Sequence, residues 1–302
     1  MDLSLSEDQA MIQDMARKFA QTELAPVAEK LDQEGDRALF LSHLKQLAEL
    51  GFMGLNVDAE YGGSQAGSVA FSLVITELAR ACASTAVSVS VTNMVAEVIQ
   101  VVASEQQKSQ YLPKLCSGDY AAGGFCLTET GAGSDPSAMK TTAVLEGDHW
   151  VLNGAKQFIS SAEYAGVFVV WAVTDRSAPK GKGISCFLVE REAPGLSVSK
   201  AEKKMGQHAS CTSEVRFDKC RIPKDALMGG LNQGFKIAVS ELAGGRIGIG
   251  SLALGVGLAA MDYARVYINE RQQFGQKLSN FQGLQWMLAD ANSELEAARL
   301  LL

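Results

Sequence analysis

The spacing of apolar residues divides the chain into three regions, and the first of them is helical. Apolar residues recur at three- and four-residue intervals in MIQDMARKFAQTEL, LSHLKQLAEL, FSLVITELARACAS and VTNMVAEVIQVVAS. The last two segments are mostly apolar, so we expect these helices to be buried. Ser6 followed by Gln9 predicts a capping box at the start of the first helix, and Gly51 predicts the end of a later one. These patterns predict an N-terminal α-helical domain over residues 1–120.

Residues 121–228 show the alternation and the turn signals of β-strands. TTAVLEGDHWVLNG predicts two strands around a Gly-Asp turn, and VFVVWAV, ISCFLVE, LSVSKA and SEVRFDKCRI predict further strands. Because no helical segments alternate with these strands, the pattern favours an antiparallel sheet over βαβ units. We therefore expect a middle antiparallel β-domain over residues 121–228.

Helical spacing returns after Asn232. The run LAGGRIGIGSLALGVGLAA has the apolar character of a transmembrane span, but Arg246 and the dense glycines favour a buried helix in close contact with its neighbours. Two GxGxxA matches begin at Gly248 and Gly255; a dinucleotide-binding fingerprint needs a preceding strand, so we reject that interpretation. The prediction is an α+β fold whose C-terminal α-helical domain covers residues 229–302.

The final predicted helix, LSNFQGLQWMLADANSELEAARLLL, ends without a stop signal. Leu300, Leu301 and Leu302 are followed by none of the residues that usually end helices. The alternative is a helix that frays at its end. Because three terminal leucines need apolar cover, we expect the C-terminal helical bundle to be incomplete in this chain.

Composition and charge narrow the class of protein. The 302 residues carry a net charge of −7 and are 47% hydrophobic, which is typical of a soluble globular protein. No basic tract is available to neutralise phosphates, which argues against a nucleic-acid partner. The opening residues, MDLSLSEDQAM, resemble neither a signal peptide nor a transit peptide, so we expect a cytoplasmic, bacterial-type protein without membrane insertion. The six cysteines form no CxxC pair and the three histidines are scattered, so we predict reduced packing cysteines and no metal site.

The segment FCLTETGAGSDPS, residues 125–137, carries the candidate chemistry. Gly131 and Gly133 can take positive φ and allow close approach of a ligand. Successive N–H groups in such a turn can form a nest for an anion, and Thr128 and Ser134 add hydroxyls. The loop suits a phosphate-bearing cofactor with a polar ring system. An ordinary polar turn between strands is the alternative.

With FCLTETGAGSDPS at the first α-to-β junction, the chain resembles the acyl-CoA dehydrogenase family, and within it the short-chain (butyryl-CoA) dehydrogenases. The resemblance covers essentially the whole chain. The other supporting segments are YGG at 61–63, LNGAKQFIS at 152–160, GKGISCFLVE at 181–190, KMGQHASCTSEVRF at 204–217, RIPKDALMG at 221–229, GFKIAVSELAGGRIGIGS at 234–251 and ERQQFGQKLSNFQ at 270–282.

The resemblance implies FAD-dependent α,β-dehydrogenation of a short- or medium-chain acyl-CoA to trans-2-enoyl-CoA, as in fatty acid β-oxidation. In the family a carboxylate removes the α-proton and the flavin accepts a hydride from the β-carbon. The electrons then pass to an electron-transferring flavoprotein. The resemblance also implies a homo-oligomer, which we expect to be a tetramer built as a dimer of dimers.

Site residues are likewise implied by the resemblance. Thr128 matches a hydrogen-bond donor to the flavin, and Ser134 matches a residue shared by FAD and acyl-CoA. The implied cofactor-binding residues are Phe125, Leu127, Thr128, Gly133, Ser134, Phe158, Ile159, Ser160, Arg271, Phe274 and Gln282. The implied substrate-binding residues are Ser134, Ala243, Gly244, Gly245 and Arg246. Arg271, Phe274 and Gln282 match a segment that reaches the FAD of a neighbouring subunit.

Three of these residues keep an alternative structural role. Phe158 is also compatible with a core position in an ordinary strand, and Arg271 with a solvated charge at a helix end. Arg246, alone in an apolar helix, needs a partner, and a salt bridge to Glu241 remains open.

The chain departs from the family at several positions. Ala243 replaces a frequent Asp, His208 replaces a common Arg, and Phe158 and Ser160 stand where many relatives have Trp and Thr. The first two changes remove polar groups that could serve CoA recognition. The second two keep an aromatic wall and a hydroxyl.

No residue matches the catalytic base. The usual catalytic Glu is expected beyond Leu302, and Gly245 occupies the position that some relatives use instead. Glu129 and Asp135 are expected to stabilise the loop. A non-catalytic flavin- or CoA-binding relative that ends at Leu302 is one alternative function, and a flavin oxidase or monooxygenase is another.

Overall fold

The N-terminal helices surround the first apolar core. The computed structural model describes residues 4–302, so Met1 to Leu3 of the opening segment lie outside the described residues. The predicted capping box is confirmed: the Gln9 amide donates to Ser6 Oγ at 3.2 Å and the Ser6 amide to Gln9 Oε1 at 3.0 Å. The helices are α1 (Glu7–Phe19), α2 (Ala28–Glu34), α3 (Arg37–Glu49), α4 (Gly67–Ala81), α5 (Ala83–Val102) and α6 (Glu105–Cys116).

Helices α4 and α5 are largely buried, as their apolar composition predicts. The chain after α1 continues through a π-helical turn and a short 3₁₀ turn that contains Pro26. Helix α3 ends just before Gly51, which adopts φ = 79° as expected for a residue that ends a helix.

An eight-stranded sheet follows the helices. Its order is β6-β7-β3-β2-β4-β5-β8, and β1 pairs with β4 off this path. The predicted hairpin of β2 and β3 is confirmed, with Gly147 at its turn in the left-handed region, φ = 61°. The strands are β1 (Ala122–Cys126), β2 (Thr142–Glu146), β3 (His149–Ser160), β4 (Ala165–Val173), β5 (Ile184–Glu190), β6 (Leu196–Val198), β7 (Thr212–Pro223) and β8 (Leu227–Met228).

The expectation of a purely antiparallel sheet is wrong for two strand pairs, because β1 lies parallel to β4 and β2 also pairs parallel to β4, at Thr142 and Val173. Gly123 lets α5 approach β1 closely, since a Cβ there would lie 2.6 Å from Val95 Cγ1. On the same strand, the Phe125 ring packs against Trp171 of β4, with ring centroids 4.5 Å apart. Contacts with both a helix and a strand therefore fix β1 at this place, and side-chain alternation alone cannot distinguish parallel from antiparallel pairing.

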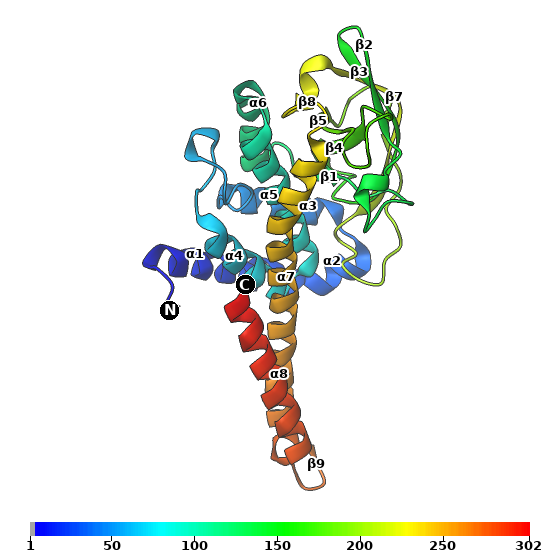
Figure 1. Ribbon diagram of the computed structural model, residues 1–302. Coiled ribbons are helices and arrows are strands. Elements are labelled where there is room, and N and C mark those ends of the chain that lie inside the picture. Colours follow the sequence, from blue (N-terminus) through cyan, green and yellow to red (C-terminus); the bar gives the residue numbers. More distant parts are fainter. Residues whose placement is uncertain (1–3) are drawn as a thin grey trace.

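The C-terminal region is a long helix pair. Helix α7 (Gly234–Glu270) begins beside the sheet and extends away from it together with α8 (Gln282–Leu301), as Figure 1 shows. A two-stranded hairpin of β9 (Gln272–Gln273) and β10 (Gln276–Lys277) joins their far ends. The GxGxxA matches lie within α7, which confirms that they are not a strand-turn-helix fingerprint.

Helix α7 is only partly buried, so the expectation of a buried helix holds in part. Gly248 packs on α5 and Gly255 on α4, where a Cβ would meet Ser90 Oγ and the Thr76 carbonyl. Several apolar residues of α7 are nevertheless exposed: Ile249, Val256, Tyr263, Val266 and Tyr267. Among the described residues, α5 and α7 are long and apolar enough to cross a membrane by length and composition alone, a property that core helices share.

Candidate active site

The signature segment forms the end of β1 and the loop that follows it. Within residues 4–302 the hydroxyls of Thr128 and Ser134 make no hydrogen bond, and Ser134 is exposed. A tight turn between Glu129 and Ala132 starts the loop, with backbone bonds of 3.2 and 3.0 Å in both directions. Free hydroxyls at the mouth of a short turn leave this part of the loop able to bind a ligand.

The two loop glycines do not adopt the left-handed backbone that the sequence suggested. Neither Gly131 nor Gly133 has positive φ, because the paired bonds of the 129–132 turn close the loop without it. The expected anion nest therefore lacks its left-handed member. A Cβ at either glycine would meet no atom of the described residues within 4 Å, so the space above both positions is open.

A segment of β3 lies directly beside this loop. The Gln157 amide donates to the Thr128 carbonyl at 2.8 Å, which joins the two segments. Phe158 has φ = 59° and its side chain is 63% exposed, so the interpretation as a core residue is wrong. Positive φ is costly for a bulky residue and recurs at ligand sites. Ile159 is buried and Ser160 is half-buried.

A hollow next to Ser160 adds a cation to this region. It has a volume of about 340 Å³ and is lined by Val87, Ser160, Lys204, Gly206, Gln207, Ser210 and Thr212. Burial lowers the pKa of Lys204, whose Nζ donates to Thr212 Oγ1 at 3.2 Å. His208, one of the departures from the family, instead binds Asp32, with Nδ1 3.0 Å from a carboxylate oxygen.

Beneath the loop lies an ion pair that the sequence reasoning missed. Lys156 of β3 is fully buried, and its Nζ lies 2.8 Å from Glu129 Oε1. Burial would raise the pKa of Glu129, but the Lys156 cation and hydrogen bonds outweigh it and hold that pKa below its usual value. The expected structural role of Glu129 is confirmed. The sequence did contain a signal for this pair: Lys156 occupies an inward position of a predicted strand, and the signature segment supplies an acidic residue, Glu129, to neutralise it.

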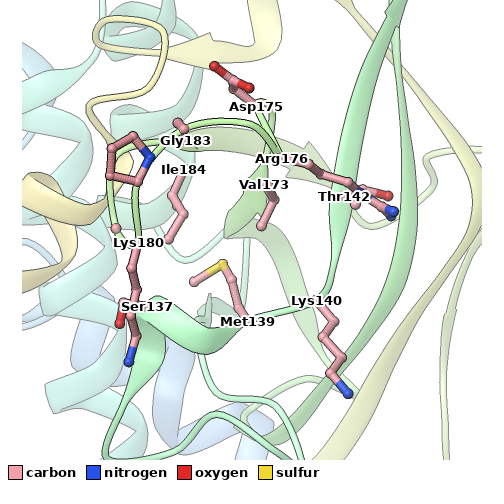
Figure 2. Close-up of a pocket in the computed structure, with 13 residues that line it drawn as sticks. Ser137, Met139, Lys140, Thr142, Val173, Asp175, Arg176, Lys180, Gly183 and Ile184 are labelled. Carbon is pink, nitrogen blue, oxygen red and sulfur yellow. The ribbon is translucent and has the colours of Figure 1, made fainter.

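A basic pocket opens on the other side of the loop. It has a volume of about 400 Å³, and three of its lining residues are cationic: Lys140, Arg176 and Lys180. Figure 2 shows Met139, Val173 and Ile184 pointing toward one another across it, whereas the Asp175 carboxylate points away. Asp135 of the loop forms an ion pair with Lys180, which confirms its expected structural role. These cations were not singled out from the sequence.

The implied substrate-binding residues of α7, residues 243–246, lie in the segment of the helix that packs on α5. Gly245 leaves room for Met94, because a Cβ would lie 2.6 Å from its Sδ atom. Arg246 is exposed and makes no ion pair within residues 4–302, so it needs no buried partner. Within residues 4–302 the suggested bridge to Glu241 is absent, and Glu241 Oε1 is buried without a hydrogen-bond partner. Burial together with the Glu97 charge raises the pKa of Glu241 to about 7.

Three implied cofactor residues lie far from the loop. Arg271, Phe274 and Gln282 are exposed at the end of α7 that is remote from the sheet, near β9 in Figure 1. A helix of 37 residues spans about 55 Å. Phe274 and Gly275 both have positive φ, which matches a two-residue hairpin turn that presents the phenyl ring to solvent. Within one chain, these residues are not brought together with Thr128.

Thiol and imidazole groups form no metal centre in the described part of the chain. No group of three His, Cys, Asp or Glu residues there is placed to hold a metal ion. All six cysteines are free and buried, which confirms that they are packing residues: Cys82, Cys116, Cys126, Cys186, Cys211 and Cys220.

Comparison with known proteins places this arrangement in one family. The model of the acyl-CoA dehydrogenase N-terminal domain matches residues 6–119, that of the middle domain residues 124–220, and that of the C-terminal domain residues 232–302. A short-chain specific acyl-CoA dehydrogenase of Clostridium acetobutylicum is 41% identical over 303 residues, which cover 100% of this chain and 79% of the relative.

Solved structures agree with the sequence matches. A chain in a structure described as the electron transferring flavoprotein of Acidaminococcus fermentans is 42% identical, with a TM-score of 0.96 over 100% of this chain and 78% of that one. An acyl-CoA dehydrogenase from Bacillus anthracis, complexed with FAD, is 34% identical, with a TM-score of 0.92 over 98% of this chain and 50% of that one. Sequence and fold together show that the chain belongs to the acyl-CoA dehydrogenase family.

Proposed function

We propose that the protein is an FAD-dependent acyl-CoA dehydrogenase, which oxidises a short- or medium-chain acyl-CoA to the trans-2-enoyl thioester. The observation that carries this proposal is the junction of the signature loop and β3. There the Thr128 hydroxyl, which has no hydrogen-bond partner within residues 4–302, lies on a segment bonded directly to the one that carries exposed Phe158. A polar donor beside an aromatic wall suits a flat ring with polar edges.

The residues present fit FAD. Phe125, Leu127, Thr128, Gly133 and Ser134 would hold one side of the cofactor, and open space above the loop glycines leaves room for it. Phe158, Ile159 and Ser160 would provide the adjoining wall, where strained Phe158 projects into solvent. When bound, FAD supplies the acceptor for the hydride that leaves the β-carbon.

The acyl-CoA would pass between the loop and α7. Ser134 and the α7 residues Ala243, Gly244, Gly245 and Arg246 would contact the substrate. Coenzyme A carries phosphates at its nucleotide end, and the basic pocket of Lys140, Arg176 and Lys180 offers charge-assisted bonds to them.

None of these residues is proposed as the base that removes the α-proton. Gly245 has no side chain, and Glu129 is held by Lys156 as a structural carboxylate. We propose that the glutamate base of the family has no counterpart among residues 1–302. The groups present bind and orient the thioester, while hydrogen bonds to its oxygen would stabilise the charge that develops on deprotonation.

We further propose a homotetramer in the cytoplasm that passes its electrons to an electron-transferring flavoprotein. Arg271, Phe274 and Gln282 are too remote to reach the loop of their own chain, which supports contact with the FAD of a second subunit. The exposed apolar residues of α7 support burial by other subunits. We keep 1–120, 121–228 and 229–302 as the proposed domains.

Anaerobic titration with butyryl-CoA tests the proposal, carried out on the flavin-loaded full protein with any residues that follow Leu302 included. Bleaching of the flavin absorbance, with return of the colour on adding an electron-transferring flavoprotein, is expected. Absence of bleaching by any acyl-CoA of a chain-length series, combined with fast reoxidation by oxygen after dithionite, would instead identify a flavin oxidase or monooxygenase. A purified protein that takes up no FAD would contradict both.

A further inference from the structure

A lysine with no exposed surface lies below the loop that carries Thr128. Its Nζ donates to Glu129 Oε1 at 2.8 Å and to the Leu127 carbonyl at 3.2 Å. Lys156 is 0% exposed, and burial of a lysine is costly unless the charge is paired and hydrogen-bonded. Leu127 and Glu129 are the neighbours of Thr128 on either side, so one ammonium group holds both flanks of that residue.

The same strand also holds Thr128 itself. The amide of Gln157, the residue after Lys156, donates to the Thr128 carbonyl at 2.8 Å. Three consecutive loop residues are thus fixed by two consecutive residues of β3. Such a short, doubly bonded connection leaves the loop little freedom to move relative to Phe158.

Glu129 extends the connection to the far end of the loop. Its carboxylate accepts from the Lys140 amide at 2.6 Å and from the Thr141 amide at 3.0 Å. The loop between residues 129 and 140 is therefore closed by a single carboxylate, which Lys156 in turn neutralises. Backbone amides and a buried cation around one carboxylate form a network whose members depend on one another.

The bond to Leu127 has an electrostatic consequence at Thr128. The Leu127 carbonyl and the Thr128 N–H belong to one peptide unit, and a cation on the carbonyl polarises that unit and strengthens its N–H as a donor. Within residues 4–302 the Thr128 N–H has no acceptor of its own. A strengthened, unpartnered donor is therefore available next to the Thr128 hydroxyl.

We propose that Lys156, paired with Glu129, is a positioning residue for the cofactor: it fixes the Thr128 peptide and stabilises the negative charge that the bound flavin gains on reduction. This inference rests on the proposed function, since it assigns Thr128 to the FAD site. Lys156 acts through the Leu127–Thr128 peptide and touches neither cofactor nor substrate. Removing the cation should weaken FAD binding and make reduction of the bound flavin harder.

Single and double variants separate the cation from the fold. Lys156→Met alone leaves Glu129 buried without its partner and tests folding rather than the proposal. Glu129→Gln keeps Lys156 and leaves its ammonium two oxygen acceptors, the glutamine carbonyl and the Leu127 carbonyl. The double variant Lys156→Met/Glu129→Gln replaces the pair with neutral groups of similar size. Glu146→Gln, which breaks a surface ion pair with Arg221 in the same sheet, is the matched control.

The measurements are the FAD dissociation constant of the apoprotein and the midpoint potential of the FAD-saturated protein. Relative to Glu129→Gln, the double variant should bind FAD at least tenfold more weakly. Its potential should be lower by about 30 mV, which corresponds to a tenfold change for a two-electron couple. Glu129→Gln itself should raise the potential above wild type, because it removes a negative charge. If the pair only maintains structure, the midpoint potential is not expected to rise in the first step, from wild type to Glu129→Gln, and to fall in the second, from Glu129→Gln to the double variant.

Several outcomes would overturn the inference. A folded double variant with wild-type FAD affinity and potential would do so, as would shifts of equal sign in both steps. A shift as large in Glu146→Gln would show that any surface charge has the same effect. A wild-type protein that does not bind FAD would overturn the proposed function and this inference together, whereas the other outcomes leave the proposed function intact.

Discussion

Replacing Glu241 with glutamine tests a carboxylate that the fold buries without a partner. Its Oε1 atom is buried and accepts no hydrogen bond within residues 4–302. Burial, together with the nearby Glu97 carboxylate, raises the pKa of Glu241 from 4.5 to about 7. The folded protein therefore favours the protonated carboxyl, whereas the unfolded chain releases this proton near pH 4.5.

The sign of the pH dependence follows from that order. Because the folded-state pKa is the higher one, stability is fully present below pH 4.5 and is lost as the pH rises through about 7. The shift corresponds to at most about 3–4 kcal/mol, at roughly 1.4 kcal/mol per pKa unit. Glu241 is only partly buried, so solvent screening reduces the effect to about 1–2 kcal/mol. Glutamine resembles the protonated carboxyl and cannot ionise, so Glu241→Gln avoids this loss.

Urea unfolding of wild type and variant at pH 5 and pH 8 measures the effect. The free energy of unfolding of Glu241→Gln minus that of wild type should become more positive by about 1–2 kcal/mol between the two pH values. Glu294→Gln, at an exposed position of α8, is the control and should show no such change. A difference that is the same at both pH values, or smaller at pH 8, would refute the reasoning.

Three further predictions concern packing, capping and cofactor binding. Gly255→Ala would place a Cβ 2.3 Å from the Thr76 carbonyl oxygen. This variant should lower stability in thermal unfolding by about 1–3 kcal/mol. Gly283→Ala is the control and should not lower stability, because a Cβ there would meet no atom of the described residues within 4 Å. Equal effects of the two substitutions would contradict the packing argument. Ser104→Ala removes the hydroxyl that caps α6 and should cost about 1 kcal/mol in urea unfolding, so an unchanged midpoint would count against the cap. Arg271→Ala should retain less FAD per subunit by absorbance, and unchanged flavin content would exclude the inter-subunit contact.

Local structure was largely predictable. The helical spacing and the Ser6–Gln9 capping box predicted α1, and the Gly-Asp turn predicted the hairpin of β2 and β3. Each of these features depends on residues a few positions apart, so a short window of sequence contains the interactions that form it. The parallel placement of β1 did not follow, because it depends on α5 and β4, which lie far away in the sequence.

The candidate site was predictable in its residue types but not in its geometry. Motifs in chain order identified Thr128, Ser134 and Phe158. The structure places Thr128 and Phe158 on two neighbouring segments that are joined by a backbone hydrogen bond. The exposure of Phe158 and of Arg246 was not predictable, because burial depends on which side of each element meets a neighbour. The Lys156–Glu129 pair was likewise missed, since its partners are 27 residues apart.

The sequence by itself determined the order of helices and strands, the capping and turn residues, and a set of motifs that identified the family. Only the tertiary structure decided which charges are buried and which are free. It also showed that Arg271 lies at the far end of α7, about the length of that helix away from the loop that carries Thr128. The physical reason is that periodicity and local hydrogen bonds are encoded within a few residues. Burial, ion pairing and distance instead arise from contacts between segments that only folding brings together.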